Sequence, residues 1–189
     1  MSLVELIAQA DDRGLAASGL ACLDRCVPLL GGDDEVLRPA WASLTEGGGD
    51  WGECLEKARA ALDPAGPGES DESGEDEAVL LARRMLEAAP AARDAAGIRV
   101  WADACSVASL QIHRLLDPAE DGAGSVDQRR EGRTEGMSPL VASELRRQVT
   151  VLELLAEHGA GGLRRALEVS VEGRRVLRAV VSRRARGRA

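Results

Sequence analysis

The chain has 189 residues, a formal net charge of −8 and 44% hydrophobic residues, enough for one folded domain with its own core. It contains no Phe and no Tyr and only three Trp, so Leu, Val and Ala must supply most of the apolar volume. Because strands rely on aromatic and β-branched side chains, this composition argues against a β-sandwich. It predicts an all-α protein, an irregular bundle of about six to eight helices.

Four cysteines in a chain of this length do not make a disulfide framework. The N-terminal residues MSLVELIAQADDRG include acidic residues and no positively charged leader, which argues against a signal peptide. No stretch approaches the roughly 18 consecutive apolar residues that would cross a bilayer. The sequence therefore predicts a cytoplasmic protein with reduced thiols and no membrane contact. Lys57 is the only lysine, a bias typical of a GC-rich bacterial genome, so arginine content by itself carries little functional weight.

Residues 1–62 have the pattern of two helical hairpins. Ser2 and Glu5 have the spacing of a capping box, which predicts a short helix ending at Gly14. A second helix is expected over 15–30, distorted in its last turn by Pro28. A third covers 37–44, and a fourth follows the glycines at 47–49 and runs to residue 62.

The pattern changes at 63–77, DPAGPGESDESGEDE, which holds seven acidic and no basic residues. Such a segment buries too little apolar surface to fold, so we expect a mobile acidic linker. Residues 78–117 predict a helix or a helix pair bent near Pro90, and 118–137 a second mobile loop. Ser138 and Pro139 provide a serine cap with proline at the first position of a helix that closes at His158. Together, 1–62, 63–77, 78–162 and 163–189 are expected to form one globular domain.

The last segment, 163–189, holds nine arginines against two glutamates, so the whole basic excess of the chain lies there. Residues 167–181 fit two structures. Alternating Leu and Val around Glu172 and Gly173 are compatible with a β-hairpin, whereas the three- and four-residue spacing of Val169, Gly173 and Val176 predicts an amphipathic helix. We favour the helix. A hairpin would resemble a winged-helix layout and strengthen the case for DNA binding.

Candidate ligand-binding residues are few. Cys22 and Cys26 lie four residues apart on one helix face, and with Cys54 and His113 they could complete a zinc site. Their position on an apolar stripe favours core packing instead. We expect His113 to be a partly exposed histidine that pairs locally with Asp117. No motif of a catalytic triad, a zinc protease or a di-metal bundle is present, so we predict neither an enzyme nor a cofactor.

A glycine-rich turn precedes Arg164 and Arg165, which would occupy the first turn of a helix, the unfavourable end of its dipole for positive charge. A bound anion or an acidic side chain could compensate, although the GK[ST] ending of a P-loop is missing. The candidate residues for binding an anion or a partner are Arg164, Arg165, Arg174, Arg175, Arg178, Arg183, Arg184, Arg186 and Arg188.

Three hypotheses for function follow. The leading one is a non-catalytic helical interaction or regulatory protein with an exposed acidic linker, a basic tail and an unknown protein partner. The second is a nucleic-acid-associated regulator that uses the arginines from Arg174 onward. The third is a small helical metal-binding protein or enzyme with Cys22 and Cys26 as ligands. A further hypothesis is that the acidic run from Glu69 to Glu77 covers the arginine tail.

Overall fold

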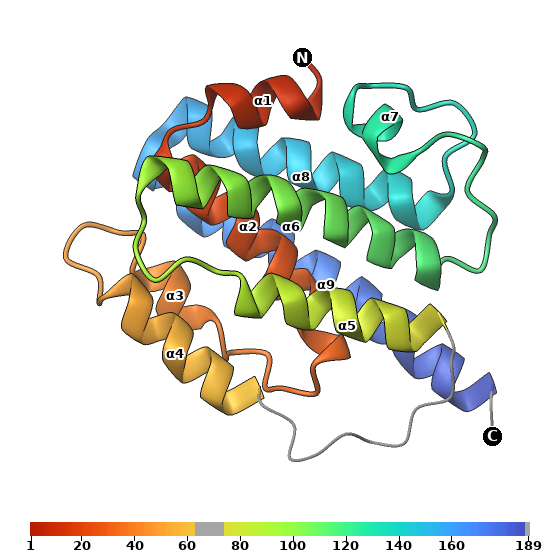
Figure 1. The fold of residues 1–189 in the computed structure, drawn as a ribbon, viewed down its shortest axis with the longest axis horizontal. Coiled ribbons are helices and arrows are strands. Elements are labelled where there is room, and N and C mark those ends of the chain that lie inside the picture. Colours follow the sequence, from red (N-terminus) through yellow and green to blue (C-terminus); the bar gives the residue numbers. More distant parts are fainter. Residues whose placement is uncertain (63–73, 188–189) are drawn as a thin grey trace.

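A computed structural model describes residues 1–62 and 74–187, and all regular structure in these ranges is helical (Figure 1). The prediction of an all-α fold is confirmed. Most of the predicted acidic linker, residues 63–73, lies outside the described residues, as do residues 188–189; the last four residues of that linker, 74–77, begin a helix instead. The α-helices are α1 (Leu3–Gln9), α2 (Asp12–Cys26), α3 (Arg38–Ala42), α4 (Trp51–Leu62), α5 (Gly74–Glu87), α6 (Ala95–Leu116), α7 (Val126–Arg130), α8 (Pro139–His158) and α9 (Leu163–Gly187).

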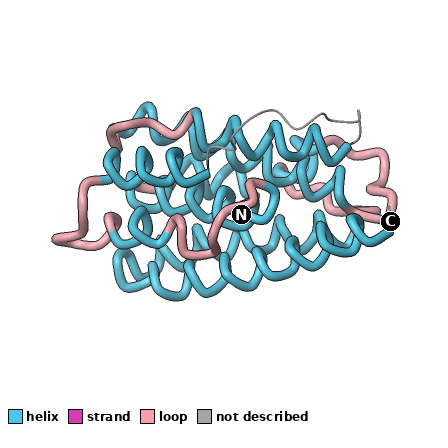
Figure 2. The backbone as a smooth tube through the Cα atoms, turned by 90° about the horizontal axis from the view of Figure 1, so that it is seen from below, coloured by secondary structure: helices cyan, strands magenta, loops and turns pink. Residues whose placement is uncertain are grey.

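Helix α2 is the centre of the bundle. It packs against α6, α8 and α9 and also touches α5. Every residue from Gly14 to Cys26 is buried. Figures 1 and 2 show the longer helices running roughly along the length of the molecule, with the connections gathered at the two ends. None of the described helices is long and apolar enough to span a membrane.

Small residues on α2 let the few large side chains pack closely. A Cβ atom on Gly19 would lie 2.6 Å from the indole ring of Trp101, so only glycine leaves room for that ring. The indole N–H of Trp101 donates to the carbonyl oxygen of Met85 at 2.9 Å, and the ring meets Trp51 edge-on, with centroids 5.9 Å apart. The tryptophans thus supply much of the bulk that Phe and Tyr provide elsewhere.

The predicted boundary at Gly14 is wrong. Helix α1 ends at Gln9, and Asp11 caps α2 by accepting a hydrogen bond from the backbone N–H of Gly14 at 2.7 Å. The glycine is therefore inside the first turn of α2, because the capping carboxylate outweighs its helix-ending tendency. The capping box of Ser2 and Glu5 is present, and α2 gives way to a 3₁₀ turn at Val27–Leu29, where Pro28 lies.

The chain breaks around Pro90 as predicted, giving the helix pair α5 and α6. The segment 118–137, predicted as a mobile loop, contains the short helix α7, and two buried arginines attach it to its neighbours. Arg130 pairs with Asp103 and donates to Ser106 Oγ at 3.1 Å, and Arg129 donates to the carbonyl oxygen of Glu135 at 2.6 Å.

Ser138 is the N-cap of α8 and Pro139 its first residue, as predicted, but the serine side chain does not make the cap. Ser138 Oγ makes no capping hydrogen bond. Instead, carboxylates of the preceding segment accept the orphan N–H groups: Asp117 Oδ2 from Leu140 at 2.7 Å and Asp121 Oδ1 from Ser138 at 2.8 Å. A carboxylate at this end of a helix also complements the dipole, which explains the preference.

Residues 167–181, for which a hairpin was the alternative, are part of helix α9. Leu163, Ala166, Ser170, Gly173, Arg174 and Leu177 form its buried stripe, which packs on α2 and α8. This burial outweighs the weak helix propensity of the valines in the segment, because tertiary packing stabilises a helix more than propensity does.

Candidate functional site

The most unusual feature of the interior is a fully buried ion pair between Arg25 of α2 and Glu144 of α8. Both side chains are 0% exposed. Arg25 donates from Nε to Glu144 Oε2 at 2.7 Å and from Nη2 to Oε1 at 2.6 Å. The pair is bidentate, the strongest geometry for an arginine and a carboxylate, and it joins residues far apart in the chain.

Two further side chains complete the hydrogen bonding of the carboxylate. Ser109 Oγ donates to Glu144 Oε1 at 2.7 Å, and Gln148 Nε2 donates to the same oxygen at 2.9 Å. Gln148 in turn accepts from Ser106 Oγ at 2.7 Å. A buried charge is tolerated when its partners satisfy it in this way. We refer to Arg25, Ser106, Ser109, His113, Glu144 and Gln148 as the buried polar network.

The electrostatics of the network favour the charged pair. Burial by itself raises the pKa of Glu144, but the charge of Arg25, the charge of His113 and the hydrogen bonds together outweigh burial and lower that pKa to about 2. The carboxylate is therefore ionised at neutral pH. It is committed to its internal partners rather than presented to a substrate.

His113 of α6 is buried, 1% exposed, so the expectation of a partly exposed histidine pairing with Asp117 is wrong. Its Nδ1–H donates to the carbonyl oxygen of Ser109 at 2.7 Å, and Nε2 lies 3.5 Å from Glu144 Oε2. Burial lowers the pKa of His113, although Glu144 opposes this effect. The ring is neutral at physiological pH and serves to fill the interior beside the ion pair.

Cys22 and Cys26 are 0% exposed and pack in the core, which confirms the core-packing interpretation. Burial raises the pKa of Cys22 to about 12 and also raises that of Cys26, so both are thiols rather than metal-binding thiolates. Cys54 lies half-buried on α4. Within the described ranges, no three His, Cys, Asp or Glu side chains form a group that could hold a metal ion.

Arg174, one of the predicted binding arginines, is an internal residue. It is 5% exposed and pairs with Asp24 of α2, whose carboxylate also accepts from the Trp41 indole at 3.2 Å. Burial raises the pKa of Asp24, although Arg174 opposes that shift. Arg178, one turn further along α9, pairs with Asp34. These arginines fasten α9 to the N-terminal part of the chain.

The remaining candidate arginines divide into two sets. Arg164 pairs with Glu168 one turn later, and Arg184 is half-buried with Nη1 3.5 Å from the carbonyl oxygen of Leu116. Arg188 lies outside the described residues. The second set consists of exposed side chains on the solvent face of α9 that have no salt-bridge partner within the described ranges. We call it the basic face: Arg165, Arg175, Arg183 and Arg186.

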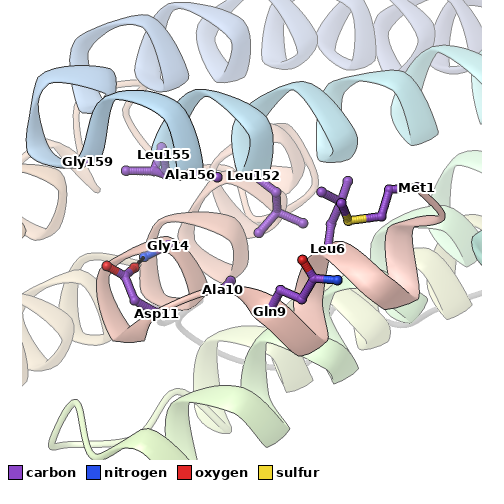
Figure 3. A pocket seen from close by; sticks show the side chains of 10 residues that line it. All are labelled: Met1, Leu6, Gln9, Ala10, Asp11, Gly14, Leu152, Leu155, Ala156 and Gly159. Atoms are coloured by element: carbon purple, nitrogen blue, oxygen red, sulfur yellow. Dashed lines mark hydrogen bonds between the residues drawn. The ribbon is translucent and has the colours of Figure 1, made fainter.

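Among the open grooves on the surface of the described residues are two that lie away from the buried network. Figure 3 shows one between the α1–α2 junction and the end of α8, lined by Leu6, Leu152 and Leu155 and about 370 Å³ in volume. One oxygen of its only carboxylate, Asp11, is used in capping α2. The other groove, about 460 Å³, runs between α5 and α6 and is mainly apolar, with Arg84 and Gln111 as its polar lining.

The sequence analysis did not find the buried polar network, although one signal was available. Glu144 and Gln148 are one turn apart beside Leu145, on the stripe that faces the core, and Arg25 interrupts a run of small apolar residues. A polar residue at a core position of an amphipathic helix requires a partner. The partner itself could not be identified from the sequence, because it lies on another helix.

The fold and its interior thus define an all-α protein with one hydrophobic core crossed by a satisfied ion-pair network. Compared with known proteins, the chain matches no protein-family model and has no significant similarity to a curated protein or to a solved structure.

Proposed function

We propose that this chain is a non-catalytic interaction protein of the cytoplasm that binds an acidic protein partner through the basic face of α9. The observation that carries the proposal is the placement of Arg165, Arg175, Arg183 and Arg186. These side chains are exposed on one helix that packs against α2 and α8, and within the described ranges they have no salt-bridge partner. An exposed set of cations on one helix provides electrostatic complementarity for a carboxylate-rich surface.

The interior supports the non-catalytic part of the proposal. The side chains best suited to acid–base chemistry, Glu144 and His113, are buried at 0% and 1% exposure and hydrogen-bonded to neighbours. The lining residues of the surface grooves include neither of them. The cysteines are free thiols, which suits a reducing compartment and supports a cytoplasmic location.

The alternative partner is a nucleic acid. The hairpin that would have favoured a winged-helix layout is instead the helix α9, packed along one face. The tail also contains no aromatic residue for base stacking. The acidic partner is therefore the proposal, and DNA binding is an outcome that the experiment must distinguish.

The experiment measures fluorescence anisotropy of a labelled polyglutamate peptide and of a labelled DNA duplex of about 20 base pairs, at roughly 50 and 200 mM salt. We expect the full chain to bind polyglutamate. The variant R175A/R183A/R186A should lose at least about tenfold in affinity, because it removes three cations from one face. The matched control R93A/R133A/R146A removes the same charge from other exposed positions and should bind like the wild type.

Two outcomes would overturn the proposal. If the duplex binds more tightly than polyglutamate, and that binding falls steeply with salt and depends on the same arginines, the nucleic-acid hypothesis replaces it. If neither probe binds, or if the control variant loses as much affinity as the triple variant, the basic face is not a binding surface.

A further inference from the structure

The solvent face of α5 has an arrangement of charge and apolar side chains that is complementary to itself. Glu77 and Arg84 are both exposed and lie seven residues apart, two helical turns or about 10 Å along the axis. Leu80 and Leu81 occupy the midpoint between them. Within the described ranges, neither Glu77 nor Arg84 has a salt-bridge partner.

The apolar part of this face is unusually exposed. Leu80 is 51% exposed, one of the four large hydrophobic side chains in the described ranges that stand out into solvent. Beside it lies the α5–α6 groove of about 460 Å³, whose lining includes Leu81, Met85 and Val107. Figure 1 shows α5 and α6 side by side, and the groove lies between them. An apolar groove next to an exposed leucine marks an interaction surface.

We propose that this face is the interface of a homodimer, in which α5 of one copy packs antiparallel on α5 of a second copy about a two-fold axis between Leu80 and Leu81. Two-fold interfaces place the same patch on both subunits, so each residue must meet its complement on the other copy. Because Glu77 and Arg84 are equidistant from the midpoint, the axis brings Glu77 of each copy opposite Arg84 of the other. The same operation brings Leu80 and Leu81 of the two copies together over the groove.

A second copy explains the observations better than other occupants. An unrelated helix would need no symmetric placement of Glu77 and Arg84 around the leucine pair. A small apolar ligand would leave Leu80, which lies outside the groove lining, exposed. This interface is a different surface from the basic face of α9, so the homodimer proposal and the proposed function are tested independently.

The test is a charge exchange on the full chain, followed by light scattering after gel filtration and by sedimentation equilibrium. We expect the wild type to be a dimer. Glu77→Arg places two arginines opposite each other at both contacts, and Arg84→Glu places two glutamates there. Each single variant should therefore weaken dimerisation at least about tenfold. The double variant E77R/R84E restores opposite charges and should dimerise like the wild type.

Mixing the two single variants gives the most specific readout. In a mixed dimer, the new Arg at 77 faces the new Glu at 84, and the native Glu77 faces the native Arg84, so both contacts are restored. The equimolar mixture should dimerise although each variant alone does not. Glu153→Arg on α8, another exposed acidic residue without a salt bridge in the described ranges, is the matched control and should leave the dimer unchanged.

A wild type that stays monomeric up to about 100 μM overturns the proposal, since a functional dimer needs at least micromolar affinity. Single variants that dimerise as well as the wild type also overturn it, as does a folded double variant or mixture that stays monomeric. Circular dichroism of each variant establishes that it is folded.

Discussion

At the scale of single residues, the interior depends on charges that satisfy one another. Arg25 and Glu144 are both inaccessible to solvent and share two hydrogen bonds. Removing one member of such a pair leaves an uncompensated buried charge and typically costs about 3–5 kcal/mol. His113 lies beside the pair as a neutral ring, so its protonation state contributes to stability as well.

Stability is expected to fall in mild acid because of His113. Burial lowers its pKa below the ordinary value of 6.5, so the unfolded chain binds the proton more readily than the folded one. The stability that the neutral His113 ring contributes is complete above pH 6.5. It is lost as the pH falls toward the lower pKa of the folded state, by up to about 1.4 kcal/mol per pH unit. Protonation of Glu144 also lowers stability, but at lower pH, because the ordinary pKa of this carboxyl is 4.5 and its folded pKa is lower still.

The measurement is the free energy of unfolding in urea at several pH values between 7 and 5. In the variant H113Q, the free energy of unfolding should no longer fall between pH 7 and 5 because of this group. H158Q is the matched control, because His158 is the only other histidine and is exposed, and this variant should keep the slope. An unchanged slope in H113Q would show that another group is responsible.

At the scale of elements, close approach between helices decides which residues are allowed. In α9, Gly173 lies in the middle of the helix, where glycine is unfavourable by propensity. A Cβ atom there would lie 2.3 Å from Arg25 Cδ and 2.9 Å from Arg147 Cδ. The glycine therefore provides the space in which the Arg25 side chain passes between α2 and α9.

We expect Gly173→Ala to destabilise the protein by about 1–3 kcal/mol, the usual cost of overpacking, although alanine is the better helix former. Gly187→Ala, in the same helix with nothing within 4 Å of its Cβ position, is the matched control and should be neutral. Urea denaturation at pH 7 measures both. A stabilised G173A variant would mean that Arg25 can move aside without loss.

At the scale of the whole molecule, α2 organises the fold. It is buried throughout from Gly14 to Cys26 and packs against α6, α8 and α9, whereas α3 and α7 are five-residue helices at the periphery. Long-range ion pairs reinforce this arrangement, because Arg25 and Asp24 of α2 connect it to Glu144 of α8 and Arg174 of α9. Local opening of α2 would break all of these contacts at once.

The amide hydrogens of α2 should therefore exchange only through global unfolding, whereas those of α3 and α7 exchange through local opening. Native-state hydrogen exchange in increasing urea measures this difference. The free energy of opening for α2 should equal the global value and show its full dependence on urea. Exchange of α2 ahead of α9 would contradict a central role for α2.

The sequence by itself determined the helical class and most of the breaks between helices. These features depend on local chemistry: the absence of Phe and Tyr, the Ser2–Glu5 capping box, Pro28 and Pro90. It also favoured the helix in α9 and the core placement of Cys22 and Cys26, because apolar periodicity is visible within one segment. The boundary at Gly14 was wrong because the carboxylate of Asp11 caps α2 there. At α8 the cap position was right, but the carboxylate of Asp117 accepts the N–H that the serine side chain was expected to take.

Only the tertiary structure decided which charges are internal. Arg174 and Arg175 are neighbours in a basic tail and look equivalent in sequence. The direction of the helix buries the first against Asp24, 150 residues away, and leaves the second in solvent. The partners of Arg25, His113 and Gly173 likewise lie on other helices. The packing of the helices brings these residues and their partners together, and no local sequence pattern predicts which residues will meet.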